Sequence, residues 1–222
     1  MIDVMVNAEI IEAMKILSLS DILLKSVYSS ELIELYGDVD FVISCGDLPY
    51  YYLEYVVDHL KKPVFFVRGN HANPIEYSKK GNRTHPWGAM ELHGRVLMHQ
   101  NVLIAGFEGS IRYNEGPFQY TQQEMWLLVL RMMPKLLLNI IRHGRALDIL
   151  VSHSPSWGVM DRPDPAHQGF RALRWLVSIF KPKYHFHGHI HIDTSESRKT
   201  QFHDTQVINS VGALVTELDL HG

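Results

Sequence analysis

The side chains best suited to chemistry stand directly after apolar, strand-like runs of the sequence. They are Asp21, Asp47, Asn70, His71, His153, His189 and His191. Carboxylate and amide oxygens together with imidazole nitrogens are ligands that suit Mn, Fe, Co, Ni or Zn. The chain also has 14 histidines and one cysteine. This balance favours a histidine-rich metal or acid–base site, in which no thiolate competes.

The elements that carry these residues alternate between strands and helices. Apolar, partly β-branched runs predict strands, and runs with a helical period predict helices. Ser30 is expected to cap the first helix and Gly37 to end it. In chain order the first elements are a strand at 15–20, a helix at 30–37, a strand at 40–45, a helix at 51–62 and a strand at 63–68. This order predicts a parallel sheet flanked by helices.

The carboxyl ends of parallel strands lie along one edge of a sheet, and ligands bind there. The sequence therefore brings the aspartates, the asparagine and the histidines to one place. Taken alone, Asp21 or Asp47 is more often a helix cap or a turn residue, and His153 is as often a buried structural histidine. Five such strand ends in one chain are hard to explain as coincidence.

The rest of the chain is less regular. Residues 94–100 and 101–107 are expected to pair as strands, residues 108–121 to form a loop, and residues 122–143 to form a long helix that breaks near Pro134. Further elements are a strand at 146–152, a helix at 169–180, a strand at 183–188 and a closing meander of short strands with a turn near Asp204. The long helix is too short in its apolar part, and too charged, to span a bilayer.

The order of these motifs resembles that of the calcineurin-like metallophosphoesterase family, whose members carry D-x-H, GD, GNH followed by an acid, a lone H, and GH-x-H. The resemblance runs from Lys15 to about Leu218, and the segments HSPSWGVMD and VINSVGA also resemble family sequences. It implies an α/β fold, a two-sheet β-sandwich flanked by helices in four layers (α/β/β/α). It also implies one domain over residues 14–222, preceded by an extension, residues 1–13.

The resemblance also implies two divalent transition-metal ions and assigns their ligands. Asp47 would bridge both metals, with Asp21 and His191 on metal one and Asn70, His153 and His189 on metal two. A metal-bridging hydroxide would attack phosphorus in line with the leaving group. His71 would not bind metal but would assist the leaving group as a general acid.

The sequence departs from the family pattern at two positions. Leu23 stands where D-x-H has its histidine, so metal one lacks an imidazole and is expected to bind more weakly. Ala72 stands where an acid follows GNH, so His71 lacks its usual carboxylate neighbour. These losses keep open a second reading, in which the chain is a non-catalytic scaffold or regulatory protein on the same fold.

The substrate is expected to be a small phosphodiester of the nucleotide type, with phosphomonoesters as the alternative. Candidate substrate-binding residues are Tyr50, Tyr51, Arg112 and His167. Tyrosines can stack on a base, and an arginine can grip a phosphate, although packing tyrosines and solvated loop charges are about as common. The net charge of −3 argues against long duplex nucleic acid and against a membrane partner.

The cysteine count bears on the compartment. Cys45 is the only cysteine, so no disulfide can form within the chain and a reducing compartment is expected. The segment 1–14 carries acidic residues and does not have the pattern of a signal peptide. Both observations favour the cytoplasm, and the sequence leaves the oligomeric state open.

Overall fold

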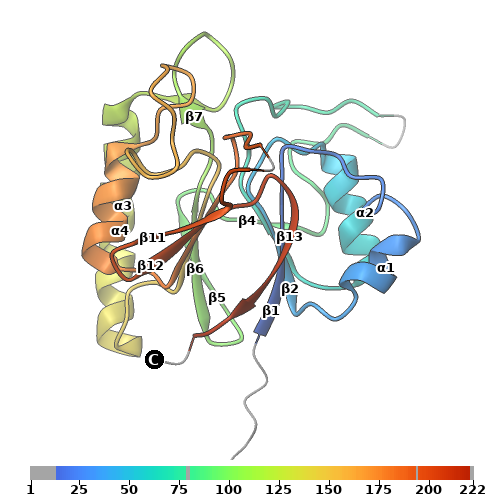
Figure 1. The fold of residues 1–222 in the computed structure, drawn as a ribbon, viewed down its shortest axis with the longest axis horizontal. Helices are drawn as coiled ribbons and strands as arrows, with labels where there is room; N and C mark the ends of the chain where they lie inside the picture. The colour runs from blue at the N-terminus through green and yellow to red at the C-terminus, as the bar shows by residue number, and fades with distance from the viewer. Residues whose placement is uncertain (1–13, 79–80, 194, 221–222) are drawn as a thin grey trace, which may run out of the picture.

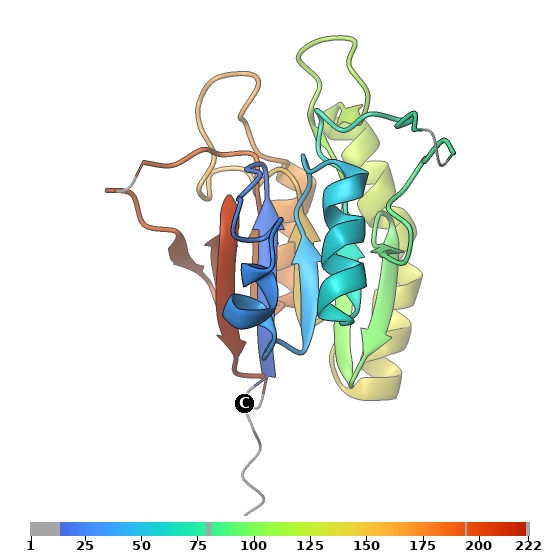
Figure 2. The same ribbon diagram turned by 90° about the vertical axis from the view of Figure 1, so that its right-hand side faces the viewer.

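Two β-sheets meet face to face, and helices cover the outer face of each sheet (Figures 1 and 2). The computed structural model describes residues 14–78, 81–193 and 195–220, so the expected extension over residues 1–13 lies outside the described residues. The four layers follow the order α/β/β/α. The expected two-sheet α/β fold is therefore confirmed.

The first sheet has five strands in the order β13-β1-β2-β3-β4. Strands β1 to β4 run parallel, and β13 pairs antiparallel with β1. Two helices, α1 and α2, cover its outer face. The bounds are β1 Met14–Ser20, β2 Phe41–Ser44, β3 Val64–Phe66, β4 Met90–Glu91, β13 Gly212–Leu218, α1 Glu31–Tyr36 and α2 Tyr50–Leu60.

The second sheet has six strands in the order β11-β12-β10-β9-β6-β5, covered by α3 and α4. A short two-stranded sheet, β7-β8, precedes α3. The bounds are β5 Arg95–His99, β6 Val102–Phe107, β7 Ser110–Ile111, β8 Gln119–Tyr120, α3 Gln122–His143, β9 Ile149–Ser152, α4 Arg171–Phe180, β10 Tyr184–His187, β11 Lys199–Phe202 and β12 Thr205–Asn209.

Side-chain alternation along the strands builds the layers. Ile16 and Ile43 point between the sheets, where they pack with Ile104 and Val151 of the second sheet. Their neighbours in sequence, such as Leu17, point the other way and pack under α1 and α2. Residues on both faces are buried, which is why these strands are continuous apolar runs.

Three expectations about the elements are wrong. Helix α3 continues through Pro134, held by the Thr121–Glu124 capping box and by an apolar face packed on the sheet. The expected loop at 108–121 contains β7 and β8. The chain end is not a simple meander, because β12 pairs parallel with β10 and the chain then crosses to the first sheet as β13.

The expected turn between β5 and β6 and the expected end of α1 are present, whereas the expected cap at the start of α1 is not. Gln100 and Asn101 both have positive φ and join β5 to β6, as a tight hairpin requires. Gly37 ends α1 as expected, but the Ser30 hydroxyl makes no capping hydrogen bond.

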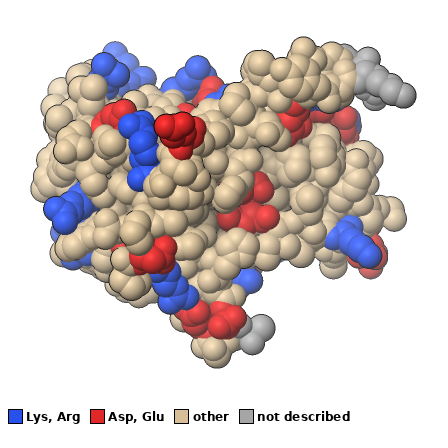
Figure 3. Space-filling view, turned by 90° about the horizontal axis from the view of Figure 1, so that it is seen from above, with Lys and Arg blue, Asp and Glu red and all other residues tan. Residues whose placement is uncertain are grey.

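Among the described residues, no helix is long and apolar enough to cross a membrane. Seen from above, Lys and Arg gather mainly over the left half, the side of α3 and α4 (Figure 3).

Candidate metal centre

The polar residues singled out from the sequence meet at one edge of the two sheets. Asp21 follows β1, Asp47 follows β2, His153 follows β9 and His189 follows β10. Ligand atoms of Asp21, Asp47 and His153 lie within 4.8 Å of one another, a grouping that could hold a metal ion. The face-to-face packing explains this, because each sheet delivers the ends of its parallel strands to the same side.

His153 lies at the centre of the site and is fully buried. Its Nδ1 lies 2.8 Å from the Cys45 carbonyl oxygen. Its Nε2 lies 2.9 Å from Oδ1 of Asn70 and 3.2 Å from Oδ2 of Asp47. One ring nitrogen is therefore fixed by the backbone, and the other faces two oxygen ligands.

The charges of His153 and Asp47 depend on each other. Burial alone would lower the pKa of His153, but the Asp47 carboxylate outweighs burial and raises the pKa to about 9. Burial alone would raise the pKa of Asp47, but His153 and the backbone N–H of His71, 2.8 Å from Oδ1, lower it to about 2. The carboxylate is thus held ionised near neutral pH.

His189 is held from two sides. Its Nε2 lies 2.9 Å from the carbonyl oxygen of Ala166, and its ring lies 4.8 Å from that of His153. Burial lowers the pKa of His189 to about 3, so its imidazole is neutral. A neutral ring whose Nε2–H donates to a carbonyl keeps Nδ1 as a ligand atom.

The far side of the site is more open at His191, although the Asp21 side chain is only 4% exposed. Nε2 of His191 lies 3.7 Å from Oδ1 of Asp21, and the His191 side chain is 66% exposed. Oδ2 of Asp21 accepts a hydrogen bond from the His189 backbone N–H at 3.0 Å. Leu23 is 49% exposed. We refer to Asn70, His153 and His189 as the inner half of the site, and to Asp21 and His191 as the outer half.

The backbone at these strand ends is strained. Asp21, Asp47 and His189 all have φ between 56 and 67°, a region that residues with a side chain rarely adopt. Gly188 makes the approach possible, since a Cβ there would lie 2.5 Å from Oδ2 of Asp21. Strain of this kind gathers at functional sites, where surrounding contacts enforce it.

The residues present fit divalent transition-metal ions. Asn70 and His153 lie beside the ionised Asp47 carboxylate. Asp21 completes the group of carboxylate and imidazole atoms within 4.8 Å of one another, a group that does not include His189 or His191. Cys45 and Ala166 supply the backbone carbonyls that fix the histidine tautomers. Such outer contacts orient metal-binding imidazoles and raise their basicity.

His71 and Asp47 both line a cavity of about 280 Å³. The His71 side chain is exposed, and only its backbone is tied to Asp47. Tyr51 and Glu76 also line this cavity. A group in this place can reach a ligand without giving up a contact to the fold, which suits proton transfer.

The four residues expected to bind substrate have different surroundings. Tyr51 is 46% exposed and lines the cavity. Tyr50 is buried, and its hydroxyl donates to the Asn73 carbonyl oxygen at 2.9 Å, so its ring has no free face in this structure and its assignment to substrate stays a prediction. Arg112 pairs with Glu124 at the start of α3. His167 pairs with Asp164, and its ring lies 5.1 Å from that of His189.

Tyr113 belongs to the site but was not singled out as a site residue from the sequence. Its hydroxyl lies 3.1 Å from Nδ2 of Asn70 and accepts a hydrogen bond from it. The amide is thereby oriented with Oδ1 toward His153. Gln119 holds the loop in place, because its Oε1 accepts from the backbone N–H groups of Tyr113 and Asn114. The exposed polar loop gave the sole signal, and loops often carry functional residues.

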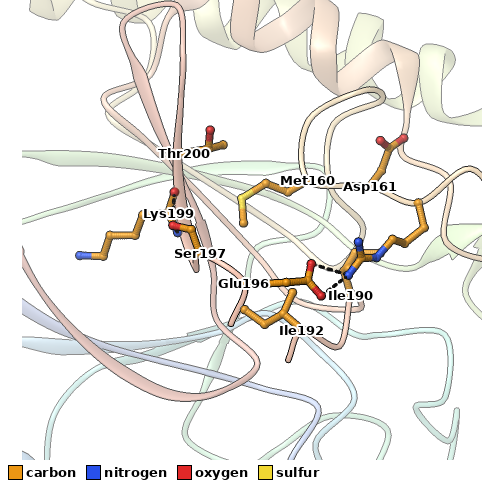
Figure 4. Close-up of a pocket in the computed structure, with 9 residues that line it drawn as sticks. Met160, Asp161, Ile190, Ile192, Glu196, Ser197, Lys199 and Thr200 are labelled. Atoms are coloured by element: carbon orange, nitrogen blue, oxygen red, sulfur yellow. Dashed lines mark hydrogen bonds and ion pairs between the residues drawn. The ribbon is translucent and has the colours of Figure 1, made fainter. Parts of the chain in front are cut away.

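A second pocket, of about 270 Å³, lies beyond the His189–His191 segment (Figure 4). Ile190 and Ile192 line it, and Nη2 of Arg162 donates to both carboxylate oxygens of Glu196, at 2.6 and 2.7 Å. The guanidinium is therefore already occupied by a carboxylate. The described residues around this pocket lack the clustered ligand atoms that mark the metal centre.

Comparisons with known proteins identify the family and support the fold. The family model described as calcineurin-like phosphoesterase matches residues 14–193. A comparison with the sequences of curated proteins gives no match. Among solved structures, TT1561 of Thermus thermophilus is similar at 13% identity and a TM-score of 0.61, over 90% of each chain. At that identity the likeness supports the fold alone.

Vacuolar Protein Sorting 29 from Cryptosporidium parvum matches at 14% identity over 89% of this chain and 73% of that chain. Its TM-score of 0.42 is too low to support an argument. The family model spans most of the sequence and both halves of the metal centre. This chain belongs to the calcineurin-like phosphoesterase family.

Proposed function

We propose that the chain hydrolyses small phosphodiesters of the nucleotide type with the aid of two divalent transition-metal ions. The observation that carries the proposal is the unbroken set of contacts from His191 through Asp21, His189 and His153 to Asn70 and Asp47. The family supports metal-dependent phosphoester hydrolysis in general. The buried cysteine is consistent with a cytoplasmic enzyme.

The ligands divide between the two ions. Asn70, His153 and His189 would hold one ion, Asp21 and His191 the other, and Asp47 would lie between them. When bound, such a pair supplies Lewis-acid stabilisation of phosphoryl oxygens and a nucleophile from water at neutral pH. Manganese suits a mixed oxygen and nitrogen ligand set, as do iron, cobalt, nickel and zinc.

His71 supplies the proton for the leaving group. His71 is one of the residues that line the cavity, and its backbone N–H donates a hydrogen bond to Oδ1 of Asp47. We expect His71→Ala to keep both metals and to slow an alkyl phosphodiester by about 10²–10⁴-fold. The loss should be much smaller with a p-nitrophenolate leaving group, which needs no proton. His59→Ala, at an exposed histidine on α2, is the matched control, and loss of metal from His71→Ala would contradict this role.

The cavity beside His71 would receive the leaving group. Tyr51 offers an aromatic face at the cavity wall, and Glu76 already accepts the backbone N–H of Tyr50 at 2.8 Å. Among the described residues, no lysine or arginine lines this cavity. A nucleoside or another neutral alcohol therefore fits it better than a group that carries further phosphates.

A non-catalytic scaffold is the competing function, and the exposed pair Ile22 and Leu23 beside Asp21 favours it. The assay that separates the two compares bis-p-nitrophenyl phosphate with p-nitrophenyl phosphate, each with Mn, Co or Ni and with a chelator. Faster metal-dependent cleavage of the diester supports the proposal, and faster cleavage of the monoester makes the protein a phosphomonoesterase. No metal-dependent turnover together with no bound metal would leave the scaffold.

A further inference from the structure

The outward face of α3 carries an apolar stripe that the fold leaves uncovered. The helix packs on the second sheet through Met125, Val129, Met132 and Leu136. On the opposite side, at 3-4-3-4 spacing, stand Leu127, Leu130, Pro134, Leu137 and Ile141, which we call the outer stripe. Its four aliphatic side chains are between 49 and 81% exposed. A row of large apolar side chains in water marks a binding surface more often than a scattered few do.

Cations border the outer stripe along one side. Arg131, Lys135 and Arg142 are exposed, and Arg95 of β5 joins the first two around a pocket of about 300 Å³. Within the described part of the chain, none of these four side chains pairs with a carboxylate. Their charges are therefore available to an external anion.

The whole molecule is polarised in the same sense. Residues 94–183 contain eleven Lys and Arg against six Asp and Glu, while the full chain contains 21 against 24. Lys and Arg accordingly lie mainly on the α3 and α4 side in Figure 3. The overall net charge of −3 conceals this separation, which is why the sequence argued against a membrane partner.

We propose that the α3 face docks on an anionic lipid surface, with the outer stripe among the acyl chains and the flanking cations at the headgroups. An apolar stripe beside basic residues is the pattern of helices that lie in a membrane interface. Trp126 of α3 and Trp175 of α4 are half-buried and in ring contact beside the stripe. Tryptophan favours this interfacial depth.

The same features count against a helix as the occupant. Pro134 stands in the middle of the outer stripe, where its ring interrupts the regular knobs of a helical zipper. Self-pairing would set the cations of one copy against those of the other, or against an apolar flank without carboxylates. Lipid requires no complementary knobs and supplies the missing negative charge.

Vesicle co-sedimentation of the full-length protein tests the proposal. Binding is expected to vesicles of equal parts phosphatidylcholine and phosphatidylglycerol, to weaken with salt, and to be absent with phosphatidylcholine alone. Arg131→Gln with Lys135→Gln should weaken binding about thirty-fold, from the usual contribution of each cation near an anionic surface. Leu130→Gln with Leu137→Gln should weaken it by at least about tenfold through lost apolar burial.

Matched controls lie on the opposite side of the molecule. Lys61→Gln with Lys62→Gln removes the same charge, and Ile33→Gln with Leu35→Gln removes exposed apolar side chains from α1. Both should bind like the parent, and circular dichroism should show all variants folded. Equal binding by the stripe variants, or no selectivity for phosphatidylglycerol, would overturn the proposal. Sedimentation velocity could also overturn the proposal. A concentration-dependent dimer that Leu130→Gln abolishes would show that the α3 face binds a second copy of the chain.

Discussion

The inner and outer halves of the metal centre differ in how firmly the protein holds them before any ligand arrives. His153 is fully buried and contacts three oxygens, whereas the His191 side chain is 66% exposed and lies 3.7 Å from its nearest carboxylate. Buried ligands with fixed tautomers lose little freedom on binding, and an exposed one must be ordered at that moment. Under the proposal of two ions, this difference predicts a preformed inner position and an outer position at which the ion must order His191.

Removing the residue between the halves should have the largest effect. Asp47→Asn keeps the shape of the side chain but loses the charge that both positions need. We expect both metals to be lost on dialysis and activity to fall by about 10³-fold. Metal content by atomic emission and diester turnover report the two losses separately. Asp58→Asn, at an exposed aspartate on α2, is the control, and full metal content in Asp47→Asn would show that the halves do not share this ligand.

Adding a metal ligand to the outer half should reduce the difference in metal affinity between the two halves. Leu23→His restores an imidazole beside Asp21, and we expect the weaker metal to bind about tenfold more tightly or better. Calorimetric titration of the metal-free protein should resolve two classes of site in the parent and bring them closer in the variant. Ile22→His is the control for an added histidine in the wrong place. A parent with one class of two equal sites would contradict the asymmetry.

Tyr113→Phe should weaken the inner half alone. The change removes the acceptor for Nδ2 of Asn70, so the amide is no longer held with Oδ1 toward His153. We expect the tighter metal to bind about tenfold less tightly, with the weaker one unchanged. The same titration measures both, and Tyr28→Phe, at another exposed tyrosine, serves for comparison. A change confined to the weaker metal would remove Tyr113 from the inner half.

The smallest expected effect is on the stability of the metal-free protein against pH. The pKa of His153 is about 9 when folded, above its ordinary value, so its contribution is complete below about pH 6.5 and is lost as pH rises through about 9. Asp47, with its pKa lowered to about 2, contributes above about pH 4 and loses this as pH falls toward 2. The thermal midpoint of chelated protein should therefore decline between about pH 7 and pH 10.

Metal-loaded protein provides the reference for this decline. The metal needs the unprotonated imidazole, so His153 is already deprotonated and its pH dependence should disappear. The comparison uses differential scanning calorimetry of chelated and manganese-loaded samples across the same range. Parallel curves for the two samples would show that another group causes the decline.

The sequence predicted the strands and where their ends meet, because buried parallel strands leave an unambiguous apolar pattern and their order fixes the binding edge. It also placed Asp21, Asp47 and His153, whose contacts follow directly from that edge. It could not tell Tyr50 from Tyr51, which are neighbours in sequence, although Tyr50 is buried and Tyr51 is exposed and lines the cavity. Neighbouring residues of a helix point about 100° apart, so only one of the two rings can face the core. The packing of α2 decides that it is the ring of Tyr50.

Other features depend on contacts that no local pattern records. The hydroxyl of Tyr113 contacts Asn70, and the backbone of Tyr113 is held by a hydrogen bond to the side chain of Gln119, six residues further along the chain. The polar sequence of this loop does not reveal either contact. The continuity of α3 through Pro134 depends on the sheet beneath it. In both cases tertiary packing decides what propensity leaves undecided.

The crossing of the chain from β12 to β13 has a consequence for the order of assembly. Strand β13 pairs with β1 over seven residues, from Met14 opposite Leu218 to Ser20 opposite Gly212. This pairing joins segments about two hundred residues apart, and such distant contacts form late and slowly. Asp21 follows directly on β1, which has strand partners on both sides, β2 and β13, only after residues 212–218 have been synthesised.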